Sequence, residues 1–206
     1  MDTDLAHAWL LAVASSVEAD RERLTRLDAE IGDGDHGTNL HRGFTAVRAA
    51  LEEIHPESVG RVLVTTGTTL ISRVGGASGP LYGTVFRTAG KRLEAPECDV
   101  AELAAALSAG YEAVCALGSA RVGDKTMLDA LHPAVEALTA ADPTGGLAAA
   151  ARAAAEAARK GAEATVDLQA RKGRASYLGS RSRGHLDPGA ASTALVFGAL
   201  ADVTSG

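Results

Sequence analysis

The chain has 206 residues, of which 46% are hydrophobic and 3% aromatic, and its formal net charge is −6. This length and the alanine-rich composition predict one closely packed helical domain over residues 1–206, while the negative charge excludes nucleic acid and anionic membranes as general partners. With two cysteines and no targeting segment, we expect a cytoplasmic protein without disulfides.

Apolar residues recur with helical spacing along most of the chain. A first helix is predicted from about residue 3 to 28, and a second covers the apolar positions 40–54, with its amino end in the loop between them. Residues 58–73 contain a β-branched run that also fits a buried strand, but the pattern favours a helix. The remaining helices are predicted at residues 78–92, 99–118, 126–141, 147–168 and 188–203.

Capping residues mark several of these helix starts. Ser78 is a candidate cap, and Asp99 opens a capping box with Glu102. Asp187 followed by Pro188 fits an N-cap and a first helical residue. No strand pattern or internal repeat competes with the helices. Eight helices with short connections predict an all-α fold, an up-and-down antiparallel barrel or bundle.

The loop after the first helix carries Asp28, Asp33 and Asp35 among glycines. Like charges this close repel one another and raise their pKa values unless a cation lies among them. Mg²⁺ prefers carboxylate oxygens and often shares its coordination with phosphate groups. Isolated aspartates beside glycines are commonly turn residues, but three at this spacing favour a metal site. The sequence therefore predicts that these aspartates bind Mg²⁺.

Three other glycine-rich or acidic motifs do not fit this loop. Residues 32–37 match the G-x-G-x-x-G spacing of dinucleotide-binding proteins, but that motif follows a strand and here contains aspartates. An EF-hand starting at Asp33 would need glycine and glutamate at the positions of Thr38 and Phe44. No GxxxxGK[ST] P-loop occurs in the sequence.

Phosphate binding is predicted where free backbone amides begin a helix. The second helix offers such amides at His36, Gly37, Thr38 and Asn39. Ala77 and Ser78 offer another set, and Arg174 in the basic segment 171–183 could grip phosphate oxygens. Other interpretations stay open: His36 as a surface residue, Ser78 as a helix cap, and the basic segment as a solvated loop.

Four segments resemble the signature blocks of the dihydroxyacetone kinase L family. They are residues 27–39, 74–84, 123–129 and 184–190, in the order and spacing of that family. The resemblance covers essentially the whole chain and implies a barrel of eight antiparallel helices holding ADP or ATP and two Mg²⁺ ions at one end. It implies Asp28, Asp33 and Asp35 as metal ligands. The nucleotide-binding residues that it implies are His36, Gly37, Thr38, Asn39, Ala77, Ser78, Gly118, Met127, Arg174, Asp187, Pro188 and Gly189.

The chain is as long as an L domain alone, without a K-type domain to hold dihydroxyacetone. The resemblance therefore implies a subunit whose bound ADP is phosphorylated by an M-type phosphohistidine subunit of the phosphotransferase system. The resulting ATP would pass its γ-phosphate to dihydroxyacetone on a K-type subunit, with no catalytic side chain on this chain. Two alternatives remain: an L subunit driven directly by ATP, acting on dihydroxyacetone or another ketose or polyol, and a non-catalytic module that signals to a transcriptional regulator. A homodimer also stays open.

Overall fold

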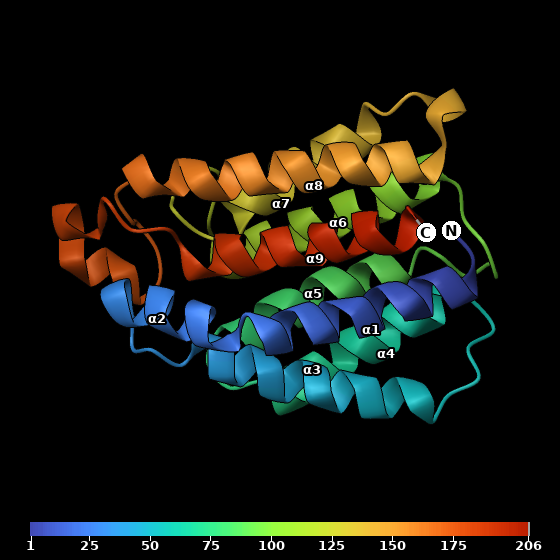
Figure 1. Ribbon diagram of the computed structural model, residues 1–206, viewed down its shortest axis with the longest axis horizontal. Helices are drawn as coiled ribbons and strands as arrows, with labels where there is room; N and C mark the ends of the chain where they lie inside the picture. Colours follow the sequence, from blue (N-terminus) through green and yellow to red (C-terminus); the bar gives the residue numbers. More distant parts are fainter. Residues whose placement is uncertain (206) are drawn as a thin grey trace.

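The computed structural model describes residues 1–205 and consists of helices joined by loops (Figure 1). Its α-helices are α1 (Thr3–Ala19), α2 (Arg21–Ile31), α3 (His36–Glu52), α4 (Val59–Arg73), α5 (Ser78–Gly90), α6 (Val100–Gly118), α7 (Leu128–Thr139), α8 (Gly146–Ala164) and α9 (Pro188–Thr204). Three short 3₁₀ helices are η1 (Pro143–Gly145), η2 (Thr165–Asp167) and η3 (Arg174–Ser182). Within residues 1–205, extended pairing is limited to an isolated bridge between Asp2 and Glu97.

Eight of the described helices close into a barrel. Around the ring, α1, α3, α4, α5, α6, α7, α8 and α9 each pack against the next, and α9 packs against α1. Neighbouring helices in this ring run in opposite directions (Figure 1). The predicted all-α, up-and-down antiparallel barrel is therefore confirmed.

The barrel has two distinct ends. The terminal end holds both chain termini (Figure 1) and the loops at residues 53–58, 91–99 and 140–145. The site end holds the loops at residues 32–35, 74–77, 119–127 and 165–187. Helices α3, α5, α7 and α9 begin at the site end, whereas α1, α4, α6 and α8 begin at the terminal end.

Side chains from the barrel walls fill its interior. Trp9 packs edge-on against Phe86 with ring centroids 6.0 Å apart, and its Nε1 donates to the Val196 carbonyl oxygen at 2.8 Å. Small residues let the walls approach closely. A Cβ added at Gly67 of α4 would lie 2.5 Å from the backbone nitrogen of Arg87 in α5. A chain with few aromatic residues thus builds a dense core from alanine and glycine contacts.

Helix α6 is long and apolar enough to span a membrane by length and composition alone. In the structure it packs between α5 and α7 as one wall of the barrel. Leu103 and Leu107, on its inner face, are buried in the core. Packing inside the barrel therefore accounts for the apolar residues on this inner face.

The prediction of a single helix over residues 3–28 is wrong. The chain breaks at Asp20, whose backbone angles are φ −96° and ψ 5°, and α2 starts at the next residue. Aspartate disfavours helix interiors, and the Asp20 carboxylate pairs with Arg23 at 2.6 Å. The buried residues Val17 and Leu24 keep an interval of seven across the break, so apolar spacing does not reveal it. The described chain therefore has nine α-helices instead of the predicted eight.

The other predicted helices agree with the structure to within a few residues. The segment 58–73 is helix α4, so the strand alternative is wrong there. The capping box is present, since the Asp99 side chain accepts from the Glu102 amide at 2.8 Å and the Glu102 side chain accepts from the Asp99 amide at 2.9 Å. Asp187 caps α9, and Pro188 is its first residue. Local capping chemistry thus locates these helix starts correctly.

Candidate functional site

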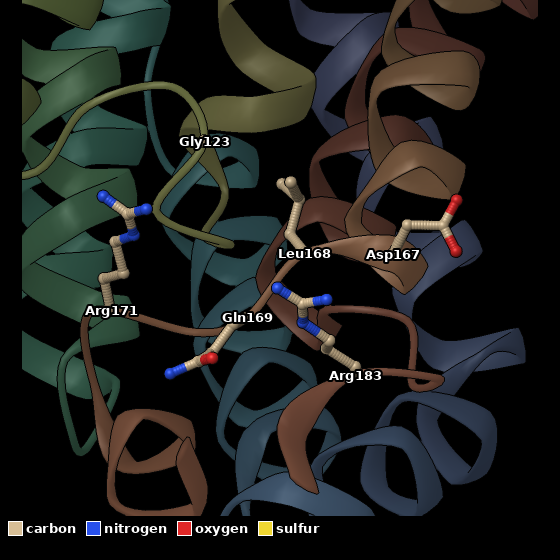
Figure 2. Close-up of a pocket in the computed structure, with 6 residues that line it drawn as sticks. All are labelled: Gly123, Asp167, Leu168, Gln169, Arg171 and Arg183. Carbon is tan, nitrogen blue, oxygen red and sulfur yellow. The ribbon is translucent and has the colours of Figure 1, made fainter. Parts of the chain in front are cut away.

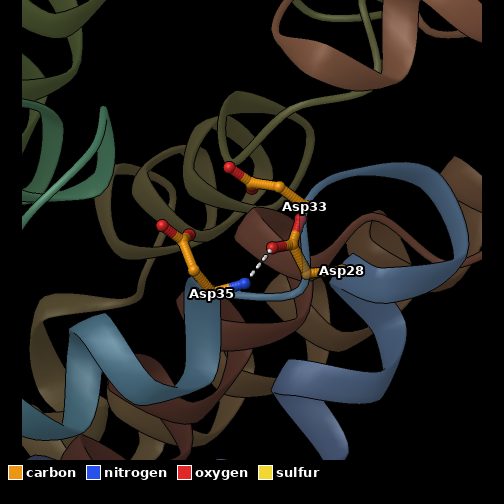
Figure 3. Close-up of side chains that lie close together, drawn as sticks. All are labelled: Asp28, Asp33 and Asp35. Carbon is orange, nitrogen blue, oxygen red and sulfur yellow. Dashed lines mark hydrogen bonds between the residues drawn. The ribbon is translucent and has the colours of Figure 1, made fainter.

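Three aspartates converge at the site end (Figure 3). Asp28 lies in the last turn of α2, Asp33 in the loop that follows, and Asp35 directly before α3. One carboxylate oxygen from each lies within 4.8 Å of the others. Asp28 is oriented by its Oδ2, which accepts hydrogen bonds from the backbone amides of Asp35 at 2.9 Å and His36 at 3.1 Å. The structure therefore brings the three predicted ligands together.

This acid cluster, Asp28 with Asp33 and Asp35, has the dimensions of a divalent-cation site. Opposite oxygens of a Mg²⁺ octahedron are about 4.2 Å apart, so a small movement would let the three carboxylates share an ion. Asp33 and Asp35 are exposed, which leaves the cluster open to solvent. Within the described chain, Arg174 places a positive group on the cluster, with Nε 2.8 Å from Asp33 Oδ2. One guanidinium against three carboxylates leaves a negative site that favours a cation.

Asp35 occupies the N-cap position of α3 without capping that helix. In the part of the chain that the structure describes, its side chain accepts no bond from the first turn and faces Asp28 and Asp33 (Figure 3). Helix α5 starts similarly, because Ala77 at its N-cap has no polar side chain. Both helices therefore direct first-turn amides and the positive end of the helix dipole toward the loops of the site end.

The ring of His36 is buried between two serines, so the interpretation as a surface residue is wrong. Ser78 is the first residue of α5 rather than its cap, and its hydroxyl lies 3.0 Å from His36 Nδ1. Ser192 Oγ of α9 lies 2.9 Å from His36 Nε2. Burial lowers the pKa of His36 against the opposing charges of Asp28 and Asp35, so the ring is neutral at pH 7. Both ring nitrogens have protein partners, so a ligand would meet the backbone of His36.

Gly37, Thr38 and Asn39 complete the first turn of α3. A Cβ at Gly37 would collide with the carbonyl oxygen of Arg21, because α3 begins in close contact with α2. The Asn39 side-chain oxygen accepts from Arg42 Nη2 at 2.8 Å, beside the glycine turn that precedes α5. Thr38 is exposed. Packing thus fixes two of these three positions and holds the turn against its neighbours.

The remaining predicted residues also lie at the site end. Met127 precedes α7, and a Cβ at Gly189 in the first turn of α9 would lie 3.3 Å from the Met127 nitrogen. Asp187 and Pro188 begin α9, and burial raises the pKa of Asp187 to about 7. Gly118 ends α6, near α5. All residues predicted for the site therefore gather at one end of the barrel.

Sequence reasoning missed Lys125, the buried cation of the loop at residues 119–127. Its Nζ donates to the carbonyl oxygens of Thr165 and His185, which joins that loop to the segments before α9. Burial lowers the pKa of Lys125, while Asp187 and Asp129 oppose that shift. A lysine between an aspartate and a threonine in a glycine-containing loop is the sequence signal that could have indicated it.

A basic hollow of about 400 Å³ lies in the loops of the site end (Figure 2). Its lining residues are Gly123, Asp167, Leu168, Gln169, Arg171 and Arg183. The Arg171 amide donates to the Asp124 carbonyl oxygen at 3.0 Å, which fixes one wall. Within residues 1–205, neither Arg171 nor Arg183 forms an ion pair. Part of the basic segment folds as η3. Arg171 and Arg183 give this end of the barrel a positive surface beside the acid cluster.

The chain is similar to known proteins along nearly its whole length. The family model of the DAK2 domain matches residues 30–202. The chain is 44% identical over 195 residues to the PEP-dependent dihydroxyacetone kinase, ADP-binding subunit DhaL, of Escherichia coli (strain K12), covering 94% of this chain and 93% of that protein. It is 43% identical over 199 residues to the PEP-dependent dihydroxyacetone kinase 1, ADP-binding subunit DhaL, of Listeria innocua, covering 97% of this chain and 96% of that protein.

Longer kinases contain a similar unit. The crystal structure of the dihydroxyacetone kinase from C. freundii in complex with AMP-PNP and Mg²⁺ aligns with a TM-score of 0.77 at 29% identity, covering 98% of this chain and 34% of that chain. The D-erythrulose kinase of Mycolicibacterium smegmatis is 40% identical over 197 residues, which are 34% of its length. The relatives therefore include separate subunits of equal length and kinases of which this chain matches about a third.

Proposed function

This chain belongs to the DAK2 domain family, and on that premise we propose that it is the ADP-binding subunit of a PEP-dependent dihydroxyacetone kinase. The acid cluster carries the proposal, because its three carboxylates converge beside two helix ends whose N-cap residues provide no side-chain cap. The match in length supports a separate subunit, since this chain covers almost the whole length of the two ADP-binding subunits described above. Of the longer D-erythrulose kinase, this chain covers only about a third of the length.

Asp28, Asp33 and Asp35 would hold two Mg²⁺ ions on the phosphates of the nucleotide. When bound, Mg²⁺ neutralises phosphate oxygens and the charge that develops on the transferring phosphoryl group. The proximity of the three carboxylates supports this role, since a cation offsets their mutual repulsion. Asp28 is the most fixed of the three ligands, because two backbone amides orient it.

The chain's own groups would bind and orient the phosphates. The amides of Gly37 and Thr38, and those at residues 77–78, would donate to phosphate oxygens at the positive ends of α3 and α5, because the amides of His36 and Asn39 already bind Asp28 and Asp35. Arg174 would exchange its contact with Asp33 for a phosphate oxygen, because the cation then neutralises that carboxylate. Gly118, Met127 and residues 187–189 would line the nucleoside part. No catalytic side chain is needed, since positioning and electrostatics carry phosphoryl transfer.

Two partner proteins would use the site end. A K-type subunit would present dihydroxyacetone to the nucleotide, and an M-type phosphohistidine subunit would rephosphorylate bound ADP. The exposed guanidinium groups of Arg171 and Arg183 support a docking face with an acidic counterpart, since complementary charge accelerates encounter. The acid cluster is at the same end, so a docked partner could reach the phosphates.

Reconstitution with purified K-type and M-type proteins tests this function. We expect dihydroxyacetone phosphate to form when PEP, the general phosphotransferase proteins and all three subunits are present, and not when this chain is omitted. Product with ATP alone, without the M-type protein, would identify the directly ATP-driven alternative. If the proteins bind each other and Mg·ADP but form no product with either donor, the kinase role is contradicted. The non-catalytic regulatory module would then be the remaining interpretation.

A further inference from the structure

A chain of buried hydroxyl groups leads from His36 into the barrel. Tyr82, in the second turn of α5, is 3% exposed, and its hydroxyl oxygen lies 2.7 Å from Ser192 Oγ and 2.8 Å from Thr193 Oγ1 of α9. It donates to the Gly189 carbonyl oxygen at 3.0 Å. Ser192 in turn contacts His36 of α3 at 2.9 Å. These side chains therefore connect the first two turns of three helices.

The connected helices are not neighbours in the barrel wall. In the ring order, α5 and α9 are four helices apart in either direction, so they stand on opposite sides. Helix α3 is two helices away from each of them. Helices α3 and α5 also touch each other directly, but wall packing fixes the spacing of α5 and α9 only indirectly, through several interfaces. The side-chain network spans the interior directly, just below the uncapped ends of α3 and α5.

One arrangement of protons satisfies the network. Tyr82 donates its proton to the Gly189 carbonyl oxygen, which leaves its own oxygen to accept from Ser192 and Thr193. In the tautomer of His36 that fits this arrangement, Nε2–H donates to Ser192 and Nδ1 accepts from the Ser78 hydroxyl. This buried network gives every hydroxyl group a partner and favours one relative position of the helices.

We propose that Tyr82 is a positioning residue for phosphoryl transfer, whose hydroxyl holds the amino end of α9 against those of α3 and α5 and so sets the spacing of the phosphate-binding amides. This inference rests on the proposed function, because it concerns binding of Mg·ADP at those helix ends. Tyr82 is buried below the surface that a nucleotide would contact, so it acts through the helix ends alone.

Replacing Tyr82 with phenylalanine separates this role from a merely structural one. The aromatic ring keeps its packing, and the hydroxyl groups of Ser192 and Thr193 still have the Gly189 carbonyl oxygen as an acceptor at 3.1 and 2.8 Å within their own helix. No buried hydroxyl group is left without a partner, so the fold is retained. The lost group is the direct link across the barrel.

Calorimetry with Mg·ADP tests the proposal. We expect Tyr82→Phe to weaken binding about tenfold, the factor that corresponds to one hydrogen bond, and Ser192→Ala to weaken it similarly because it breaks the link to His36. The control is Tyr111→Phe, since Tyr111 stacks on His132 of α7 with ring centroids 5.0 Å apart and lies outside the network. We also expect both network variants to turn over more slowly at saturating ADP in the reconstituted system. Their unfolding midpoints should stay within a few degrees of that of Tyr111→Phe.

The outcomes of these measurements separate the positioning role of Tyr82 from the proposed function. Unchanged Mg·ADP affinity and turnover in both network variants would overturn the positioning role while leaving the proposed function intact. An equal loss in Tyr111→Phe would also overturn it. Should Tyr82→Phe fail to fold, Ser192→Ala decides by the same criteria. Absence of Mg·ADP binding to the unmodified chain would instead remove the proposed function on which this role depends.

Discussion

The helices that begin beside the acid cluster start differently from most of those that begin at the terminal end of the barrel. At the terminal end, Asp2, Ser58 and Asp99 cap α1, α4 and α6 with their side chains. At the site end Asp187 caps α9, but the N-cap residues Asp35 and Ala77 of α3 and α5 provide no side-chain cap within the described chain. Both sets of helices belong to the same barrel, so the fold does not require this difference. Capped amides stabilise the protein, whereas uncapped amides remain available to an anion.

Asp35 and Asp99 make the contrast concrete. Both occupy the N-cap position of a long helix, but Asp99 accepts a hydrogen bond from its helix and Asp35 faces two other carboxylates. A capping side chain contributes about 1 kcal/mol to stability. Asp35 forgoes this contribution and adds charge repulsion, as expected of a side chain that serves the proposed metal site instead of stability.

Replacing each of these two aspartates in turn gives the largest expected effect. Asp35→Asn should weaken Mg·ADP binding by on the order of 100-fold, because it removes a charged metal ligand, and leave stability unchanged or higher. Asp99→Ala should lower the free energy of unfolding by about 1 kcal/mol and leave Mg·ADP binding unchanged. Calorimetry and urea unfolding measure the two quantities. Equal behaviour of the two variants would remove the distinction between the ends.

Two glycines sharpen the comparison by their surroundings. Gly37→Ala should destabilise the protein by about 1–3 kcal/mol, because its Cβ would collide with the Arg21 carbonyl oxygen where α3 meets α2. Gly198→Ala, inside α9 with nothing within 4 Å of its Cβ position, should stabilise it by about 0.5–1 kcal/mol. Urea unfolding measures both. Stabilisation by Gly37→Ala would show that α2 and α3 are not in the described contact.

Asp187 gives the last of these effects, through pH. Its pKa is about 7 in the folded chain because of burial, against 3.8 ordinarily. Between these values the unfolded state has lost the proton that the folded state keeps, so stability falls as pH rises, by at most about 1.4 kcal/mol per pH unit. Asp187→Asn retains a capping side chain and should flatten this slope between pH 5 and 6. An unchanged slope in urea unfolding at the two pH values would show that Asp187 is ionised throughout.

The sequence is informative where the determinants are local. Asp28, Asp33 and Asp35 lie in one short loop, so their convergence follows from a single turn between helices. The caps at Asp99 and Asp187 likewise depend on residues three positions away. Helix periodicity in a chain with little competing strand signal was enough to predict an all-α, up-and-down barrel or bundle.

Long-range packing explains what the sequence does not reveal. The partner of His36 Nε2 is Ser192, 156 residues away, so burial of that ring depends on how α9 returns across the barrel. Lys125 donates to carbonyl groups 40 and 60 residues away. The break at Asp20 leaves the apolar spacing intact. Such features depend on the closed ring of helices, which local patterns do not specify.

Metal dependence of ADP binding tests the central claim most directly. With Mn²⁺ as the paramagnetic substitute for Mg²⁺, water-proton relaxation counts the ions bound per chain, and calorimetry follows ADP in the same samples. We predict two ions per chain in the presence of ADP, and loss of ADP binding when a chelator removes them. ADP binding of equal strength in the chelator, or no Mn²⁺ bound by the chain with ADP, would contradict a cation held by Asp28, Asp33 and Asp35.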